Sequence, residues 1–173
     1  MKPMESLIDC LVLDEMSALA RNVPPGAFVE FGVYKGGSAY RLMQVARERG
    51  NDLYLYDTFS GIPFRGEFDQ HDIGDFSDTS YEAVRQLIPD AIFCRGIFPS
   101  SVVSMPPLAF VHIDADQYQS YVDAFDVFEP LMVMGGVMWF DDIFCLASAD
   151  KAINERYSGR VVTSKTGKGY VVF

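Results

Sequence analysis

Three aspartates at the ends of two apolar runs are the side chains best placed to do chemistry. Asp114 ends the run FVHID, and Asp141 and Asp142 end the run VMWFDD, which follows after one helix-length interval. The interval has room for a crossover helix and a second parallel strand, so the three carboxylates can meet at neighbouring strand ends. Carboxylates that meet raise one another's pKa unless a cation neutralises them, so we expect a shared Mg2+ or another hard divalent cation.

The alternative is that these acids have only local roles. Asp141 and Asp142 could be solvated loop acids, and we assign Asp116 mainly to capping the helix that follows it. Histidine and cysteine play no evident part in the pattern, which disfavours zinc.

A glycine-rich turn, VEFGVYKGGS at residues 29–38, precedes both acidic runs. Gly32 and Gly36 allow the backbone to reverse from a buried strand into a helix while leaving amide groups open to a ligand. The spacing differs from the GxGxxG of dinucleotide sites, and Glu30 would repel a pyrophosphate but suits a cationic amine. The turn therefore favours a ligand such as S-adenosylmethionine, although a merely tight turn is the alternative.

Two further segments could complete an adenosine site. Asp57 ends the run LYLYD, where an acid can accept hydrogen bonds from both ribose hydroxyls, and we assign the adjacent Thr58 to the same site. Gly96 and Phe98, in the segment CRGIFP, could line the adenine. The alternatives are a turn cap at Asp57 and a turn with a core phenylalanine at Phe98.

The chain as a whole predicts one α/β domain over residues 1–173, with an N-terminal helix and cap at residues 1–26. Its 173 residues are 49% hydrophobic, and strand-like and helix-like apolar periods alternate along it. We expect strands at residues 27–31, 52–56, 91–95, 109–113 and 137–140, and a closing hairpin of residues 160–164 and 170–173. We expect helices at residues 8–19, 37–49, 79–88, 117–131 and 146–157.

Three local features refine this prediction. Thr79 and Glu82 form a capping box that would open the third helix, and Gly135 and Gly136 predict a turn before the last parallel strand. Residues 59–78 show no clear periodicity, and structureless segments of that length in a compact domain are usually functional or disordered. We interpret this segment as a cover over the active site, the alternative being a plain surface loop.

Charge and composition exclude several classes of protein. A net charge of -10 would repel phosphate backbones, so we expect no nucleic-acid partner. The most apolar window, residues 131–140, is too short to cross a bilayer, so we expect no membrane association. The acidic N-terminal stretch is unlike a signal peptide, and three widely spaced cysteines fit reduced thiols. We therefore expect a cytoplasmic protein.

Taken in order, the motifs VEFGVYKGGSAYRL, YLYDTFSGIP, GDFSDTSYEAV, FCRGIFPSSV, FVHIDADQYQSYVDAFDVFEPL and GGVMWFDDI resemble those of the macrocin O-methyltransferase family. The catechol O-methyltransferase arrangement is a more distant resemblance. The family's enzymes are metal-dependent class I methyltransferases that methylate sugar hydroxyls in natural products. The resemblance, over roughly residues 27–173, implies a Rossmann-like, mostly parallel seven-stranded sheet with an antiparallel last strand and helices on both faces.

The resemblance also implies site residues and partners. S-adenosylmethionine would lie over the first two strand ends, with Asp57 on its ribose, and Mg2+ would lie on Asp114, Asp141 and Asp142. The positions that match the motif around the methionine part are Glu30, Gly32, Tyr34, Gly36 and Ser38. Relatives assemble into dimers or larger, so we expect a homo-oligomer.

These observations lead to one leading hypothesis and two alternatives. The leading one is a metal-dependent O-methyltransferase acting on a hydroxyl of a small diol-bearing molecule, a sugar or natural-product glycoside. Asp114 would act as metal ligand and could act as base, and His71 resembles a loop histidine of some relatives that could accept the proton, unless it is a solvated bystander. The alternatives are a non-catalytic S-adenosylmethionine-binding module and a metal-dependent hydrolase using the same acids.

Overall fold

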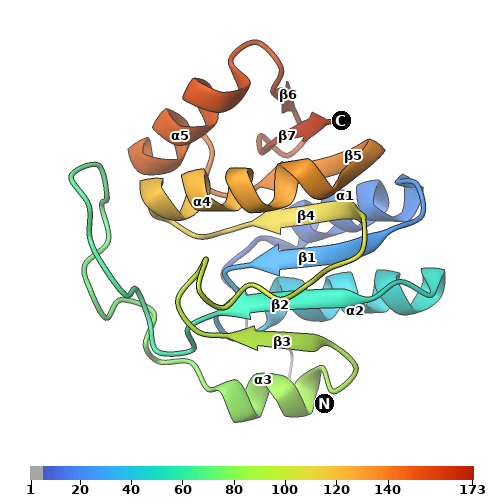
Figure 1. The fold of residues 1–173 in the computed structure, drawn as a ribbon, viewed down its shortest axis with the longest axis horizontal. Coiled ribbons are helices and arrows are strands. Elements are labelled where there is room, and N and C mark those ends of the chain that lie inside the picture. Colours follow the sequence, from blue (N-terminus) through green and yellow to red (C-terminus); the bar gives the residue numbers. More distant parts are fainter. Residues whose placement is uncertain (1–5) are drawn as a thin grey trace.

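A computed structural model describes residues 6–173 and shows one sheet of seven strands (Figure 1). The strands are β1 (Ala27–Phe31), β2 (Leu53–Asp57), β3 (Ile92–Arg95), β4 (Leu108–Ile113), β5 (Met132–Phe140), β6 (Val162–Thr163) and β7 (Gly169–Val172). Their spatial order is β3-β2-β1-β4-β5-β7-β6, parallel from β3 to β5, with β7 antiparallel to both of its neighbours. The predicted, mostly parallel sheet is confirmed, as is the closing hairpin.

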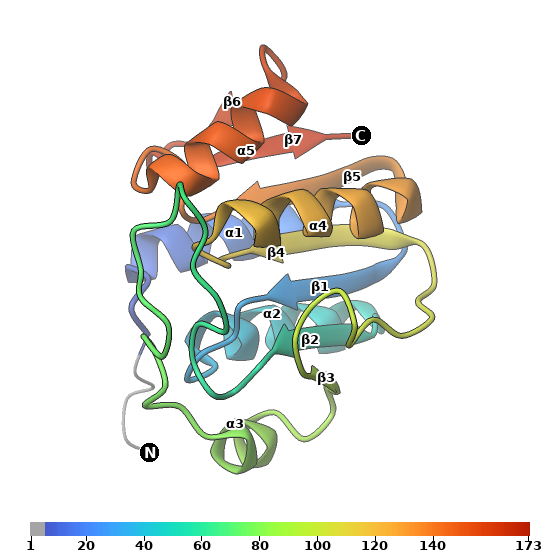
Figure 2. The ribbon, with the colours of Figure 1, turned by 60° about the vertical axis from the view of Figure 1, so that its left-hand side comes forward.

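Helices cover both faces of this sheet, as predicted (Figures 1 and 2). The helices α1 (Cys10–Asn22) and α2 (Gly37–Arg49) pack on one face, and α4 (Tyr118–Phe128) and α5 (Ala147–Tyr157) pack on the other. The short helix α3 (Tyr81–Leu87) lies near the β3 edge, and a 3-10 turn, Glu129–Leu131, follows α4. The order of connections reverses between β1 and β4, so a crevice opens at the carboxyl ends of these two strands.

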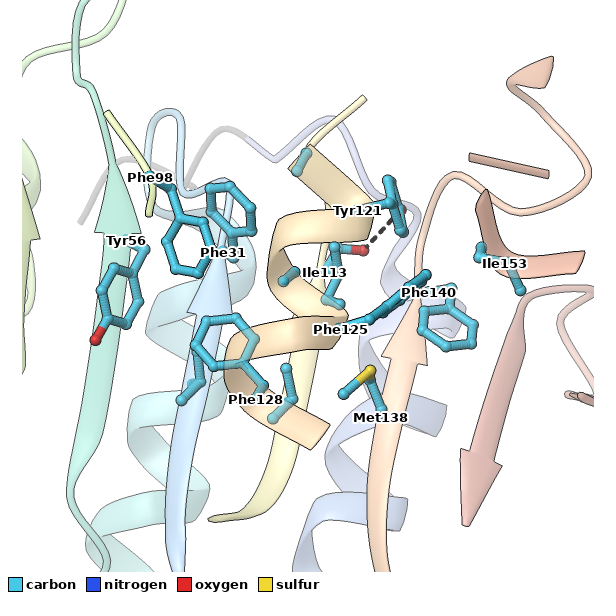
Figure 3. Packing of buried hydrophobic residues seen from close by; sticks show 14 of the residues in the cluster. Phe31, Tyr56, Phe98, Ile113, Tyr121, Phe125, Phe128, Met138, Phe140 and Ile153 are labelled. Atoms are coloured by element: carbon cyan, nitrogen blue, oxygen red, sulfur yellow. Dashed lines mark hydrogen bonds between the residues drawn. The ribbon is translucent and has the colours of Figure 1, made fainter. Parts of the chain in front are cut away.

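The two central strands, β1 and β4, are buried at every position, which is why they read as nearly continuous apolar runs. Figure 3 shows the aromatic cluster between the sheet and α4. There Phe31 and Phe98 stack with ring centroids 4.5 Å apart, and Tyr56 and Phe128 pack around Phe98. Burial of each such ring contributes about 1.5–3 kcal/mol, so this cluster fixes the strand ends from which the crevice is built.

Two local predictions were wrong. Gly135 and Gly136 do not form a turn before a strand but lie within β5, where the N–H of Gly135 donates to the Phe173 carbonyl. The pairing of β4 with β5 shifts register at this point, so an irregularity in the ladder absorbs the extra residues. The expected Thr79 capping box does not form either, because Ser80 caps α3 and the Thr79 hydroxyl donates to the Tyr34 carbonyl.

Residues 59–78 contain no helix or strand, and they run along the carboxyl ends of the strands toward α5 (Figure 2). The base of this segment is closed by two hydrogen bonds, from Ile62 N–H to the Asp75 carbonyl at 2.9 Å and from Gly74 N–H to the Ile62 carbonyl at 3.0 Å. Over residues 6–173, no helix combines the length and the apolar character that crossing a bilayer requires.

Candidate active site

A cavity of about 280 Å³ opens at the carboxyl ends of β1, β2, β4 and β5. Its position is the one that the reversal in strand order predicts for a ligand. The predicted site residues on its wall are Gly32, Tyr34, Ser38, Asp57, Thr58, Gly96, Phe98, Asp114, Asp141 and Asp142. Two other predicted cofactor-binding residues, Glu30 and Gly36, do not line the cavity.

The glycine turn brings the ends of β1 and β4 into direct contact. Gly32 has φ +89°, and a Cβ on it would lie 1.8 Å from the Asp114 carbonyl oxygen, so no other residue fits there. Gly36, with φ +83°, forms the N-cap of α2, and Gly37 and Ser38 of the first helical turn line the cavity. Because the first N–H groups of a helix have no partner within it, this end of the cavity suits the carboxylate of a ligand.

Asp57 holds the glycine turn in shape. Its Oδ2 accepts hydrogen bonds from the N–H groups of Val33 at 2.7 Å and Tyr34 at 2.9 Å, and its Oδ1 accepts one from Phe59 at 2.6 Å. A carboxylate has about four acceptor sites, so Asp57 keeps capacity for a ligand on the cavity wall. The predicted ribose contact stays a prediction, and the structural role was missed from the sequence.

Glu30 is fully buried beneath the cavity, so it does not face a ligand directly. Its Oε1 accepts a hydrogen bond of 2.6 Å from the Ser38 hydroxyl, and its Oε2 lies 3.5 Å from Nδ1 of His112. Burial alone would lower the pKa of His112, but the Glu30 carboxylate beside it raises that pKa above its ordinary value. Glu30 is therefore linked to the cavity by its hydrogen bond with Ser38, because Ser38 lies on the cavity wall.

Asp114, Asp141 and Asp142 converge as predicted. One carboxylate oxygen from each lies within 4.8 Å of the others. Burial, followed by the charges of Asp142 and Asp141, raises the pKa of Asp114 well above its ordinary range. Burial also raises the pKa of Asp142, and Oδ1 of Asp141 is buried without a hydrogen-bond partner among the described residues. Such a set of hard oxygen donors, with surplus negative charge, fits a divalent cation.

The assignment of Asp116 to helix capping was wrong. Asp116 has φ +59°, and its side chain lines the cavity, where burial and the charges of Asp142 and Asp141 raise its pKa to about 8. The N-cap position of α4 is Gln117, and the first helical N–H, that of Tyr118, donates to Asp69 of the segment 59–78 instead. The DAD pattern of residues 114–116 was the signal in the sequence for a second inward-facing acid.

The segment 59–78 contributes one side of the cavity, with Gly61, Ile62, Pro63, Phe64 and Phe76 on the wall. The side-chain amide of Gln117 donates to the Phe64 carbonyl and ties the segment to the start of α4. His71 stands behind the wall, with Nε2 3.5 Å from Oδ1 of Asp116 and Nδ1 3.4 Å from Oδ2 of Asp75. His71 is therefore linked to the acidic side of the cavity wall through Asp116.

The N-terminal region contributes residues 6–8 to the wall. The expected N-terminal cap also includes residues 1–5, which lie outside the described part of the chain. Sequence reasoning missed Lys168, whose ammonium binds Oδ2 of Asp141 at 2.9 Å, and Tyr121, whose hydroxyl donates to Oδ2 of Asp142 at 2.9 Å. No spacing rule connects either residue with the acids.

A sequence profile described as macrocin-O-methyltransferase (TylF) matches residues 4–166. The chain belongs to the macrocin O-methyltransferase family. A relative from Streptomyces olivaceus, 8-demethyl-8-(2,3-dimethoxy-alpha-L-rhamnosyl)-tetracenomycin-C 4'-O-methyltransferase, is 29% identical, with 79% of this chain and 59% of the relative covered. The demethyldecarbamoylnovobiocin O-methyltransferase of Streptomyces niveus is 26% identical, with 89% of this chain and 64% of the relative covered. The chain thus spans about three fifths of the length of each of these two relatives.

Among solved structures, the O-methyltransferase NovP superposes on this family member with a TM-score of 0.83 at 22% sequence identity. The match covers 96% of this chain and 81% of NovP. Together with the strand order, it confirms the predicted Rossmann-like class I methyltransferase fold.

Proposed function

We propose that this chain transfers a methyl group from S-adenosylmethionine to a hydroxyl of a small diol-bearing molecule, a sugar or natural-product glycoside, with a divalent cation bound at the acidic cluster. One observation carries the proposal. A single cavity joins the glycine turn and Asp57 at one end to Asp114, Asp141 and Asp142 at the other. The names of both Streptomyces relatives describe O-methyltransferases, and that of the Streptomyces olivaceus relative, which includes a rhamnosyl group, supports the acceptor class.

The cofactor end of the cavity fits S-adenosylmethionine in four respects. The Ser38 hydroxyl and the buried Glu30 behind it suit the cationic amine, and the start of α2 suits the carboxylate. Asp57 has acceptor capacity for the ribose, and Phe98 and Gly96 give a surface for the adenine. Bound there, the cofactor would supply the methyl group.

The acidic end fits Mg2+ or a similar hard cation, because three aspartates offer oxygens and one of these oxygens is buried without a partner among residues 6–173. Asp114, Asp141 and Asp142 would hold the ion. Bound there, it would supply Lewis-acid activation and orientation of the acceptor hydroxyl.

The chain must also accept the proton of the acceptor hydroxyl. Asp116 faces the cavity beside the acidic cluster, and Nε2 of His71 lies 3.5 Å behind its Oδ1. Asp116 is therefore the group that would take the proton, with His71 able to receive it at Nε2. Asp114 is less suited as base because one of its oxygens belongs to the cluster that would hold the cation. The segment 59–78 would cover the site and exclude water.

Isothermal titration and turnover assays test this function. The unaltered chain should bind S-adenosylmethionine and, with Mg2+ and a sugar diol acceptor, form methylated product. Asp141→Asn should abolish metal-dependent turnover while leaving cofactor binding unchanged, because Asp141 belongs to the acidic end. Cofactor binding without turnover on any diol acceptor would identify a non-catalytic binding module, and hydrolysis without cofactor binding would identify a hydrolase.

A further inference from the structure

The two carboxylate oxygens of Asp141 differ in their hydrogen bonding. Its Oδ2 accepts a hydrogen bond of 2.9 Å from the Lys168 ammonium, which also donates to the Asp141 backbone carbonyl at 2.5 Å. Its Oδ1 is buried and has no hydrogen-bond partner in the described part of the chain. Two contacts with the same residue fix the ammonium against Oδ2, so Oδ1 is the oxygen of Asp141 that a cation can reach without approaching a positive charge.

Asp142 shows the same division of its oxygens. Its Oδ2 accepts hydrogen bonds of 2.9 Å from the Tyr121 hydroxyl and of 2.9 Å from the Asp116 N–H. Tyr121 is fully buried on α4, where its hydroxyl also lies 3.2 Å from the Ile113 carbonyl (Figure 3). Because these donors come from packed elements, Oδ2 of Asp142 stays committed to the protein.

Lys168 is itself held in place by the rest of the fold. It lies on the turn between β6 and β7, and its backbone N–H and carbonyl both bond to Ser164. Glu15 of α1 accepts hydrogen bonds of 2.8 Å from the N–H groups of Lys165 and Thr166 on the same turn. The ammonium is therefore positioned by a braced turn.

Building on the proposed metal-dependent function, we propose that Lys168 and Tyr121 determine which cation the acidic cluster takes. By occupying one oxygen each of Asp141 and Asp142, they restrict both aspartates to single-oxygen ligation. Mg2+ requires near-octahedral geometry with few protein oxygens, whereas Ca2+ takes six to eight oxygens and often uses both oxygens of a carboxylate. Lys168 and Tyr121 thus favour binding of Mg2+ over Ca2+. They are positioning residues, because they act on the cation through Asp141 and Asp142.

The ratio of two affinities isolates this effect from charge. Removing the Lys168 ammonium increases the attraction of the site for any divalent cation, but Mg2+ and Ca2+ carry the same charge and gain equally. Only the freed carboxylate oxygen distinguishes the two ions. A disordered site would also favour Ca2+, because Mg2+ demands the stricter geometry, so rescue by Lys168→Arg and thermal melting separate the positioning role from a structural loss.

The experiment is calorimetric titration of the full chain with MgCl2 and with CaCl2, without acceptor. In Lys168→Met, the Ca2+-to-Mg2+ affinity ratio should rise about tenfold, the scale on which groups that orient ligands act. In Tyr121→Phe the ratio should rise by a smaller factor, because the Asp116 N–H still donates to Oδ2 of Asp142. Lys165→Met removes an exposed charge from the same turn and should leave the ratio unchanged. Lys168→Arg, which keeps a charged donor, should stay closer to the unaltered chain than Lys168→Met.

Tyr121→Phe keeps the ring in the core, so it provides a folded variant if the turn in Lys168→Met unfolds, and thermal melting verifies both. An equal change in the two affinities in the folded variants, or no change, would overturn the role of Lys168 and Tyr121 while leaving the methyltransferase proposal intact. Failure of the unaltered chain to bind either cation would instead overturn the metal site, and this inference with it.

Discussion

The Asp69 carboxylate caps helix α4 by accepting the backbone N–H of Tyr118 at 2.8 Å. Asp69 belongs to the segment 59–78, is buried, and accepts the Gly66 N–H with its other oxygen at 2.7 Å. Asp69 thus both anchors the segment 59–78 and accepts a hydrogen bond from the first N–H of α4. Order in the segment and stability of the helix are coupled through one side chain.

Asp69→Ala should therefore destabilise the protein by about 1 kcal/mol, the usual cost of losing a helix cap. It should also make the segment 59–78 more accessible to protease, because the segment loses its internal bond to Gly66 as well. Urea unfolding and limited proteolysis measure the two effects.

Asp69→Asn is the matched control for this prediction, since asparagine is an equally good cap, and it should retain most of the stability. If Asp69→Ala unfolds at the same urea concentration as the unaltered chain and its segment 59–78 resists protease equally, the coupling between segment and helix does not exist.

Gly32→Ala should be far more damaging than Gly50→Ala, although both glycines have positive φ. A Cβ at Gly32 would lie 1.8 Å from the Asp114 carbonyl oxygen, whereas nothing lies within 4 Å of one at Gly50. We expect about 1 kcal/mol of destabilisation for Gly50→Ala and more than about 3 kcal/mol, or failure to fold, for Gly32→Ala. Comparable unfolding free energies for the two variants would show that the β1–β4 approach is not tight.

The sequence predicted the sheet because its strands have distinct apolar runs, and it predicted the meeting of Asp114 with Asp141 and Asp142 because parallel strands end at one edge. It failed where a contact distant in sequence decided the outcome. Asp116 looks like a helix cap when only its neighbours are considered, but Asp69 already fills that role, and Asp116 turns into the cavity.

The glycines show the same limit. Gly135 and Gly136 carry a turn signal, yet the backbone of Phe173 pairs with both and keeps them in β5.

The strand-end position of Asp57 suggested a ligand contact, but its hydrogen bonds to the N–H groups of Val33 and Tyr34 depend on how close β2 lies to the glycine turn. Local sequence patterns identify the important residues, whereas the hydrogen-bond partners of these residues depend on how the strands pack in the folded sheet.

Glu15 braces the β6–β7 turn in a way that makes part of the stability of the fold depend on pH. The Glu15 carboxylate accepts the N–H groups of Lys165 and Thr166 and the Thr166 hydroxyl. Partial burial alone would raise the pKa of Glu15, but these donors hold it below its ordinary value. A group whose folded pKa is depressed stabilises the fold above its unfolded pKa, and this contribution is lost as the pH falls through the folded pKa.

Glu15→Gln should therefore lower the free energy of unfolding by about 1 kcal/mol at neutral pH, on the scale of a few exposed hydrogen bonds. The difference from the unaltered chain should shrink as the pH falls below the ordinary glutamate pKa of about 4.3, and it is lost as the pH passes the lower pKa of the folded state. Urea titrations across this range measure it. Glu67→Gln is the control, because Glu67 is an exposed glutamate of the segment 59–78 and does not belong to the turn. If the loss of unfolding free energy in Glu15→Gln stayed constant with pH, the carboxylate charge would not stabilise the turn. The positioning of Lys168 would then need another explanation.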